Sequence, residues 1–295
     1  MSSVTIQQLP KLLIGVLSAE KYHARRQACR ETWANCAAYE QVDLVFLIGD
    51  PQASLPYREA DVLYCPCPDS YESLPQKTRW FCLWALASSP FDFLFKCDDD
   101  TYVAVERLLA ILPSADYVGH DIGGYASGGA GYLLSREAAM TVAGRMTAAT
   151  GAEDWLASQA LFCAKIPFVA DSRFHAWNNR VPQTDNDQIT THYCKAQLLH
   201  RIHRRLCNNS PPSSIFRRLW AKHPHWEGEI VLFDDGAMAR PGGDQGTYEL
   251  EEGVELSLHW DSWPTELLNW DKETETFNCA DKAFTLRYLS VAAQE

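Results

Sequence analysis

The sequence has no apolar run that approaches the length of about 20 residues that a membrane-spanning helix requires. The apolar segment at 9–17, LPKLLIGVL, is too short for this role. It also lacks the basic flank and the cleavage site of a signal peptide. We therefore expect no transmembrane segment and a cytoplasmic location.

Positive charge is also scarce in this chain. It has 26 Lys and Arg against 38 Asp and Glu, which gives a formal net charge of −12. This balance argues against a surface that binds a polyanion, so no nucleic-acid partner is expected. The basic stretch at 200–206, HRIHRRL, is interpreted as the solvated side of a helix.

Metal-binding cysteine spacings are absent, although the chain contains ten cysteines. Cys65 and Cys67 are separated by one residue, which is not the spacing of a zinc knuckle. Cys82 and Cys163 lie in apolar sequence surroundings. Because no export signal is recognised, we expect mainly reduced, buried thiols.

The first 200 residues, roughly, show a regular alternation of strand-like and helix-like segments. Continuous apolar runs predict buried strands at 11–19, 42–49, 61–65, 91–97 and 116–120. Helical patterns fall at 25–39, at 72–89 with Pro75 in the first turn, and at 103–112. This order predicts an α/β fold with a largely parallel sheet covered by helices on both faces.

The pattern changes near residue 207, where the composition breaks at CNNSPPSS. Short alternating segments follow at 228–234, 246–252, 254–260 and 284–290, which predicts a small antiparallel β unit. We expect a catalytic domain at 1–206, a linker at 207–224 and a β domain of unknown role at 225–295. Five tryptophans follow residue 207: Trp220, Trp226, Trp260, Trp263 and Trp270. They could form a sugar-stacking surface, but we prefer the interpretation that they are buried in the small β core.

Three consecutive carboxylates, Asp98 to Asp100, follow the apolar strand residues 93–95. They would repel one another strongly unless positive charge lay among them. The carboxyl ends of strands are also where ligands bind in open α/β sheets. A solvated acidic turn is one interpretation. The apolar lead-in favours the other, a site for a hard divalent cation that also takes phosphate oxygens as ligands.

Four further segments are compatible with a ligand site, and each also has an ordinary structural explanation. Glycines let a backbone approach a ligand or simply make a turn, and acidic residues at a helix start suit its positive end. An imidazole can complete a carboxylate metal site, and arginines face phosphate or pair with acids. The residues are Gly128, Gly129 and Gly131; Glu153 and Asp154; His175 and His192; and Arg25, Arg26 and Arg30.

Taken in order, these segments resemble the inverting β-1,3-glycosyltransferase family, which includes galactosyl- and N-acetylglucosaminyltransferases with the Fringe and core-1 enzymes as relatives. The resemblance covers about residues 11–205. Cys29 stands where the family has isoleucine, and Trp155 where it has the valine of EDV. The matching stretches are RRQACRETW (25–33), FLIG (46–49), DSYESLPQKT (69–78), KCDDDTYV (96–103), GGAGY (128–132) and EDW (153–155).

The resemblance implies a GT-A fold, which is Rossmann-like, a UDP-sugar donor and an Mn²⁺ or Mg²⁺ ion at the donor diphosphate. By position, Asp100 resembles the direct metal ligand, and Asp98 lies near the donor ribose or supports the ion. His192 in TTHY resembles the family's late metal-binding histidine. His175 in RFHAW remains the competing candidate.

By the same resemblance Asp154 is the catalytic base. It would take a proton from an acceptor hydroxyl that attacks the anomeric carbon, which inverts its configuration. The implied reaction moves galactose or an N-acetylhexosamine from a UDP-sugar to a glycan acceptor, with a β-1,3 linkage. A metal-dependent phosphohydrolase and a non-catalytic sugar-binding protein are the alternatives. The residues expected on the donor side are Arg25, Tyr71, Lys77, Asp98, Asp99, Gly129 and Gly131.

Overall fold

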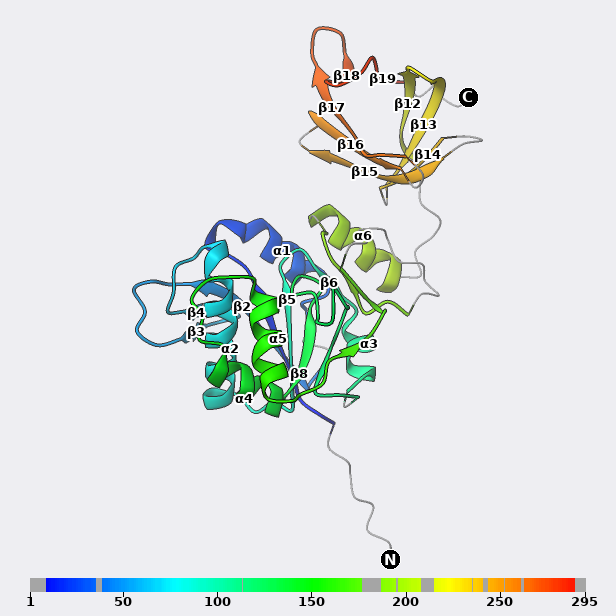
Figure 1. Cartoon of the computed structure of the whole chain (residues 1–295). Coiled ribbons are helices and arrows are strands. Elements are labelled where there is room, and N and C mark those ends of the chain that lie inside the picture. The colour runs from blue at the N-terminus through cyan, green and yellow to red at the C-terminus, as the bar shows by residue number, and fades with distance from the viewer. Residues whose placement is uncertain are drawn as a thin grey trace, which may run out of the picture. The chain divides into compact units, whose positions relative to one another are not determined.

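The chain divides after His203 into two compact units, which are described separately (Figure 1). None of the helices in the described part of the chain combines the length and apolar composition needed to span a bilayer. The computed structural model describes residues 9–35, 39–112, 114–176, 187–194, 196–207, 215–234, 236–240, 244–251, 253–260 and 263–289.

The first unit is built on an eight-stranded sheet with the order β3-β4-β2-β1-β5-β8-β7-β9. Strands β4, β2, β1 and β5 are parallel, as the apolar runs predict. The sheet is nevertheless mixed, because β8 runs antiparallel to both β5 and β7, and β3 runs antiparallel to β4. The strands are β1 Leu12–Leu17, β2 Val42–Gly49, β3 Tyr57–Glu59, β4 Val62–Cys65, β5 Phe93–Asp98, β7 Tyr117–Gly119, β8 Tyr132–Ser135 and β9 Val169–Ala170.

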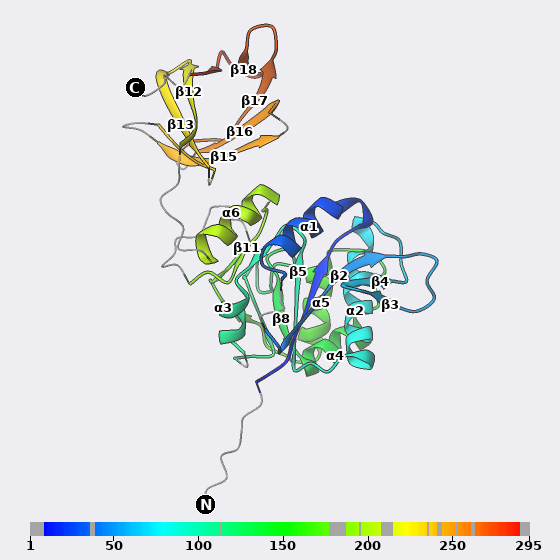
Figure 2. The same cartoon turned by 180° about the vertical axis from the view of Figure 1, so that it is seen from behind.

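Helices cover this sheet on both faces, as expected. Leu13, Leu17 and Leu94 face a core shared with α2, α4 and α5, and these helices lie together against the sheet in both views (Figures 1 and 2). On the other face the Arg30 guanidinium of α1 lies 4.8 Å from the centre of the Phe46 ring. The helices are α1 His23–Glu31, α2 Leu74–Ser88, α3 Val105–Ala110, α4 Arg136–Arg145, α5 Glu153–Cys163 and α6 Ala196–Cys207.

Two helices are shorter than the sequence predicts. The first ends at Glu31 rather than continuing to 39, and Thr32 closes it by donating its backbone N–H to the carbonyl of Cys29. The predicted helix at 103–112 starts later, because β6 (Tyr102–Val103) pairs instead with β11 (Thr190–Thr191). Together with β10 (Phe174–His175), these strands form a small second sheet, which ends next to His192.

The second unit is a closed antiparallel barrel of eight strands. The predicted linker at 207–224 is too long, because 215–223 form β12, which pairs with β13 and closes the barrel against β19. Trp226, Trp260 and Trp270 pack against the barrel core. The strands are β12 Ile215–His223, β13 Trp226–Phe233, β14 Ala237–Ala239, β15 Gln245–Glu251, β16 Glu255–Trp260, β17 Glu266–Asp271, β18 Thr276–Cys279 and β19 Thr285–Tyr288.

Candidate functional site

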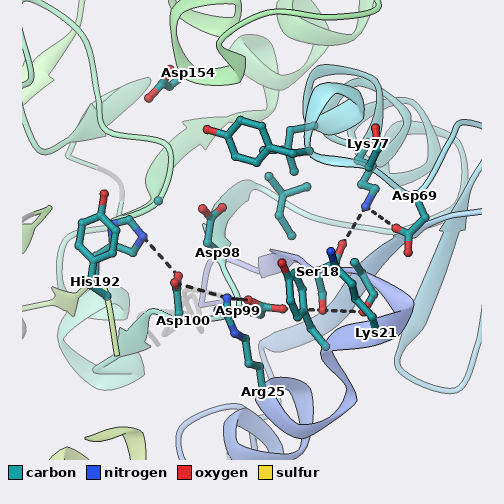
Figure 3. A pocket seen from close by; sticks show the side chains of 18 of the residues that line it. Ser18, Lys21, Arg25, Asp69, Lys77, Asp98, Asp99, Asp100, Asp154 and His192 are labelled. Atoms are coloured by element: carbon teal, nitrogen blue, oxygen red, sulfur yellow. Dashed lines mark hydrogen bonds and ion pairs between the residues drawn. The ribbon is translucent and has the colours of Figure 1, made fainter. Parts of the chain in front are cut away.

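A pocket of about 410 Å³ lies in the first unit, where β1 and β5 reach their carboxyl ends (Figure 3). Carboxyl ends of parallel strands are the usual ligand edge of such sheets. Two of the residues to which the resemblance assigns a role, His175 and Gly131, do not line this pocket. Those that do are Arg25, Tyr71, Lys77, Asp98, Asp99, Asp100, Gly129, Asp154 and His192.

Asp98, Asp100 and His192 come together at one side of the pocket. One ligand atom from each lies within 4.8 Å of the other two, although Asp100 and His192 are 92 positions apart in the chain. The His192 Nε2 atom lies 3.3 Å from Asp100 Oδ1. Carboxylate oxygens with one imidazole form a donor set that suits Mn²⁺ or Mg²⁺.

The orientation of the His192 ring favours a bound cation. Its Nδ1 atom lies 3.2 Å from the carbonyl oxygen of Ala176, and because a carbonyl only accepts, Nδ1 is the donor nitrogen of this hydrogen bond,. The other nitrogen, Nε2, then faces the Asp100 carboxylate and is the ring atom that would bind a cation shared with that carboxylate,. A carbonyl that fixes the tautomer of a histidine is the usual support of a metal ligand.

His175, the competing candidate, is not part of this group among the described residues. It belongs to β10, and its backbone carbonyl accepts a hydrogen bond of 3.1 Å from the backbone N–H of His192. Burial lowers the pKa of the His175 ring, and the neighbouring His120 adds to the effect. His175 therefore supports the segment that carries His192.

The glycine loop, residues 128–131, leaves space at Gly129 for the ring of His192. A Cβ on Gly129 would fall on the ring atoms of His192, so this position accepts no larger side chain without displacing the ring. The Gly129 carbonyl also accepts 2.7 Å from the Thr101 hydroxyl. Gly131 has a φ of +91° and packs against Phe95. It is therefore a turn residue rather than a residue that contacts the sugar-nucleotide donor.

Asp99 differs from its two neighbours because it is buried. Its carboxylate accepts hydrogen bonds from the Ser18 hydroxyl at 2.7 Å and from the Arg25 guanidinium at 3.1 Å (Figure 3). Burial raises the pKa of Asp99 to about 6 in spite of both hydrogen bonds. The same Arg25 nitrogen lies 3.5 Å from Asp100 Oδ2. Arg25 therefore supplies part of the positive charge that offsets the repulsion among Asp98, Asp99 and Asp100, here called the triple Asp.

The opposite wall of the pocket depends on Lys77. Its ammonium is buried and donates to the Ser18 carbonyl at 2.8 Å and to Asp69 at 2.6 Å. Asp69 also accepts from the backbone N–H groups of Glu20 and Gly49. Lys77 thus fixes the loop after β1 to the loop before α2, while the exposed Tyr71 stands at the rim.

Two adjacent carboxylates begin α5 but have different surroundings. Glu153 is buried, accepts from the Tyr132 hydroxyl at 2.5 Å and pairs with Lys96 at 2.9 Å. Asp154 reaches the pocket. Its carboxylate accepts a hydrogen bond of 3.1 Å from the Gly128 N–H and one of 2.8 Å from the Trp155 N–H. Only Asp154 of this pair has access to a ligand.

Sequence reasoning missed three residues of the site. Ser18 connects Asp99 with Lys77, and its only sequence signal is its place after the first strand. Lys96 is buried and donates to Asp98 and Glu153, and these carboxylates outweigh burial and raise its pKa. Tyr193 has a φ of +61°, and its ring stacks on His192 with the ring centres 3.9 Å apart.

Comparison with known proteins shows what part of this unit is similar to. Residues 24–122 match the family model "Galactosyltransferase". The chain is 31% identical over 109 residues to hydroxyproline O-galactosyltransferase GALT2 of Arabidopsis thaliana, which covers 34% of this chain and 16% of that protein. It is 32% identical over 120 residues to N-acetyllactosaminide beta-1,3-N-acetylglucosaminyltransferase 2 of Homo sapiens, with 36% of this chain and 30% of that protein covered.

A third relative is the human UDP-GlcNAc:betaGal beta-1,3-N-acetylglucosaminyltransferase 9, which is 32% identical over 144 residues, or 38% of this chain and 35% of the relative. The matched stretches thus span 16% to 35% of the length of these relatives. Among solved structures, a glycosyltransferase involved in the glycosylation of the major capsid of PBCV-1 has 12% identity and a TM-score of 0.42, covering 65% of this chain and 98% of that one.

The matched region lies in the unit that holds the pocket, and it carries Arg25, Lys77 and the triple Asp. These matches support the resemblance to the β-1,3-glycosyltransferase family over about a third of this chain. The expected α/β class is also confirmed: an α/β domain with a mixed sheet is followed by a smaller β unit.

Proposed function

We propose that this protein is a metal-dependent inverting glycosyltransferase that moves a hexose from a UDP-sugar to a hydroxyl of a glycan, with formation of a β-1,3 linkage. The observation that carries the proposal is the meeting of Asp98, Asp100 and His192 with Asp154 in one pocket. A cation site and a carboxylate with ligand access are the two parts that this chemistry needs.

Asp100 and His192 are the residues proposed to hold the ion, with Asp98 as the third. When bound, Mn²⁺ or Mg²⁺ supplies Lewis-acid stabilisation of the negative charge that grows on a departing diphosphate. The donor set fits because it offers carboxylate oxygens and an imidazole whose Nε2 atom faces Asp100 while Nδ1 is held by the Ala176 carbonyl. The buried Lys96 keeps Asp98 oriented by a hydrogen bond of 3.2 Å.

The loop after β1 is proposed to receive the diphosphate side of the donor. Arg25 is partly exposed in the pocket and presents donors that match phosphate oxygens,. Ser18 of this loop is held by its hydrogen bonds to Asp99 and Lys77. Tyr71, which is largely exposed at the rim, has a ring surface available to the nucleotide.

Asp154 is proposed to act as the general base. Its carboxylate is oriented by two backbone N–H groups and faces the pocket. It would take the proton of an acceptor hydroxyl while that oxygen forms its bond to the anomeric carbon and the bond to the UDP oxygen breaks. A single displacement of this kind inverts the anomeric configuration.

The shared pocket also favours transfer over the alternatives. A phosphohydrolase would use the acidic cluster without requiring Asp154 near it, and a sugar-binding protein would require no base. For the compartment we propose the cytoplasm, which accords with the free thiols of Cys29, Cys65, Cys67, Cys82, Cys97, Cys163, Cys194 and Cys279.

The test is an assay of UDP release with a panel of UDP-galactose, UDP-glucose and their N-acetylated forms. We expect release with Mn²⁺ or Mg²⁺, stimulation by a sugar acceptor, and loss with EDTA. Asp100→Asn is the matched variant and should release little UDP at the same metal concentration. Absence of metal-dependent release from every donor, together with absence of donor binding, would overturn the proposal.

A further inference from the structure

A large aromatic side chain is exposed directly beside the proposed base. Trp155 follows Asp154 in the first turn of α5, and 46% of its surface is accessible. Its ring meets that of Tyr125 edge to face, with the ring centres 5.3 Å apart. Exposure of an indole costs free energy that a ligand can recover by covering it.

The partner of Trp155 stands on a well-ordered turn. The Tyr125 carbonyl accepts 3.0 Å from the Ile122 N–H, and Asp121 accepts from the backbone of Gly123 and Gly124. The turn is closed by a bridge between Asp121 and Ala126. An aromatic group on such a turn is preorganised, so a ligand need not order it on binding.

The aromatic pair stands close in the chain to residues of the pocket wall. Ile122 and Ser127, which flank Tyr125 in the chain, both line the pocket, as does Asp154. Figure 3 shows Asp154 set apart from Asp98, Asp100 and His192 within the same pocket. Trp155 and Tyr125 therefore lie, by their chain neighbours, beside the part of the pocket that holds the base.

We infer that Trp155, supported by Tyr125, binds the terminal sugar ring of the acceptor, so that the acceptor is a sugar-terminated glycan rather than an amino-acid hydroxyl. The inference rests on the proposed function. A pyranose ring has a face of C–H groups that stacks on an indole while its hydroxyls stay available for hydrogen bonds. Asp154 is then within reach of a hydroxyl at the edge of that ring.

The experiment measures acceptor kinetics of the full chain with methyl β-galactoside, methyl β-N-acetylglucosaminide and a hydroxyproline-containing peptide. Trp155→Ala should raise KM for the preferred methyl glycoside about tenfold, the scale of one lost aromatic contact. The donor KM and the UDP release in the absence of acceptor should change less than about twofold, and Trp155→Phe should keep most of the affinity.

Phe162 supplies the matched control, because it is an aromatic residue on the same helix with 75% of its surface exposed. Phe162→Ala should leave every constant unchanged. Three results would overturn the inference: an unchanged sugar KM in Trp155→Ala, a fall in kcat alone, or a preference for the peptide acceptor.

A binding measurement separates this inference from the proposed function. Saturation-transfer NMR with the two methyl glycosides detects contact of sugar C–H protons with the protein without any turnover. Signals that persist in wild type and Phe162→Ala but vanish in Trp155→Ala support the aromatic site. Equal signals in all three proteins would reject it, whereas a lack of metal-dependent UDP release would reject the proposed function alone.

Discussion

The ring of His192 occupies the space where a side chain on Gly129 would begin. The two residues lie 63 positions apart in the chain, and the contact joins the glycine loop to the proposed metal site. The absence of a side chain at Gly129 therefore serves the packing of the His192 ring and not only the approach of a ligand. This gives the glycine a role that can be tested by substitution.

Gly129→Ala should weaken Mn²⁺ binding by about tenfold or more, because the new methyl group displaces His192 from Asp100. Calorimetric titration of Mn²⁺ into the full chain measures the change. Gly144→Ala is the matched control, since its Cβ meets no atom within 4 Å and the site lies in α4. That control should bind Mn²⁺ normally and gain up to about 1 kcal/mol in stability. Equal Mn²⁺ affinities in both variants would contradict the contact.

The two histidine candidates should differ sharply. His192→Ala removes a proposed ligand and should reduce Mn²⁺ affinity at least about tenfold. His175→Ala keeps the backbone carbonyl that supports His192, so its affinity should stay within about threefold of wild type. Electron paramagnetic resonance of free Mn²⁺ in a titration measures both. A larger loss in His175→Ala would assign the metal to the other histidine.

Glu153 and Asp154 should separate stability from catalysis. Glu153→Gln leaves the buried Lys96 without its closest carboxylate, although Asp98 retains part of the compensation. The expected cost is about 2–4 kcal/mol in the free energy of unfolding, measured with urea. Asp154→Asn should cost less than about 1 kcal/mol yet abolish transfer to acceptor. Full transfer by Asp154→Asn would refute its assignment as base.

The barrel contains a pH-dependent contact. The buried His223 ring donates from Nε2 to Glu266 at 3.1 Å, and its Nδ1 accepts from the His225 N–H at 3.2 Å. Burial lowers the pKa of His223, although Glu266 opposes the shift and Lys282 adds to it. The unfolded chain therefore binds a proton more readily, and stability should fall as the pH drops below about 6.5, by at most about 1.4 kcal/mol per pH unit.

His223→Gln should flatten this dependence, because the amide can still donate to Glu266 but does not ionise. Hydrogen exchange of amides in β12 and β17, compared at pH 7.5 and 5.5 after correction for intrinsic rates, is the measurement. The prediction is wrong if wild type and variant lose protection equally over this range.

The part of the fold that could be predicted from the sequence is the part with strong local signals. The apolar run of β1 is buried along its whole length, and Pro75 indeed lies in the first turn of α2. Strand β8 was not predicted, because glycines precede it and a helix follows at once. Strand β3 was missed for another reason: all three of its residues are exposed, so no apolar pattern marks it.

The site divides in the same way. Asp98, Asp100 and Asp154 stand in short motifs that are visible in the chain. Ser18 contacts Lys77 and Asp99, which lie 59 and 81 positions further along the chain. Lys96 contacts Glu153, which lies 57 positions further along. No local sequence pattern encodes such contacts. The closure of the barrel is likewise a pairing of first strand with last.

The central claim is transfer from a UDP-sugar with inversion, and the anomeric configuration of the product tests it most directly. Proton NMR of the reaction of an α-linked UDP-hexose, Mn²⁺ and a methyl glycoside acceptor follows the new anomeric signal. We predict a β-linked product that forms with wild type and is absent with Asp154→Asn. An α-linked product, or the same β-linked product at an undiminished rate in Asp154→Asn, would contradict the account.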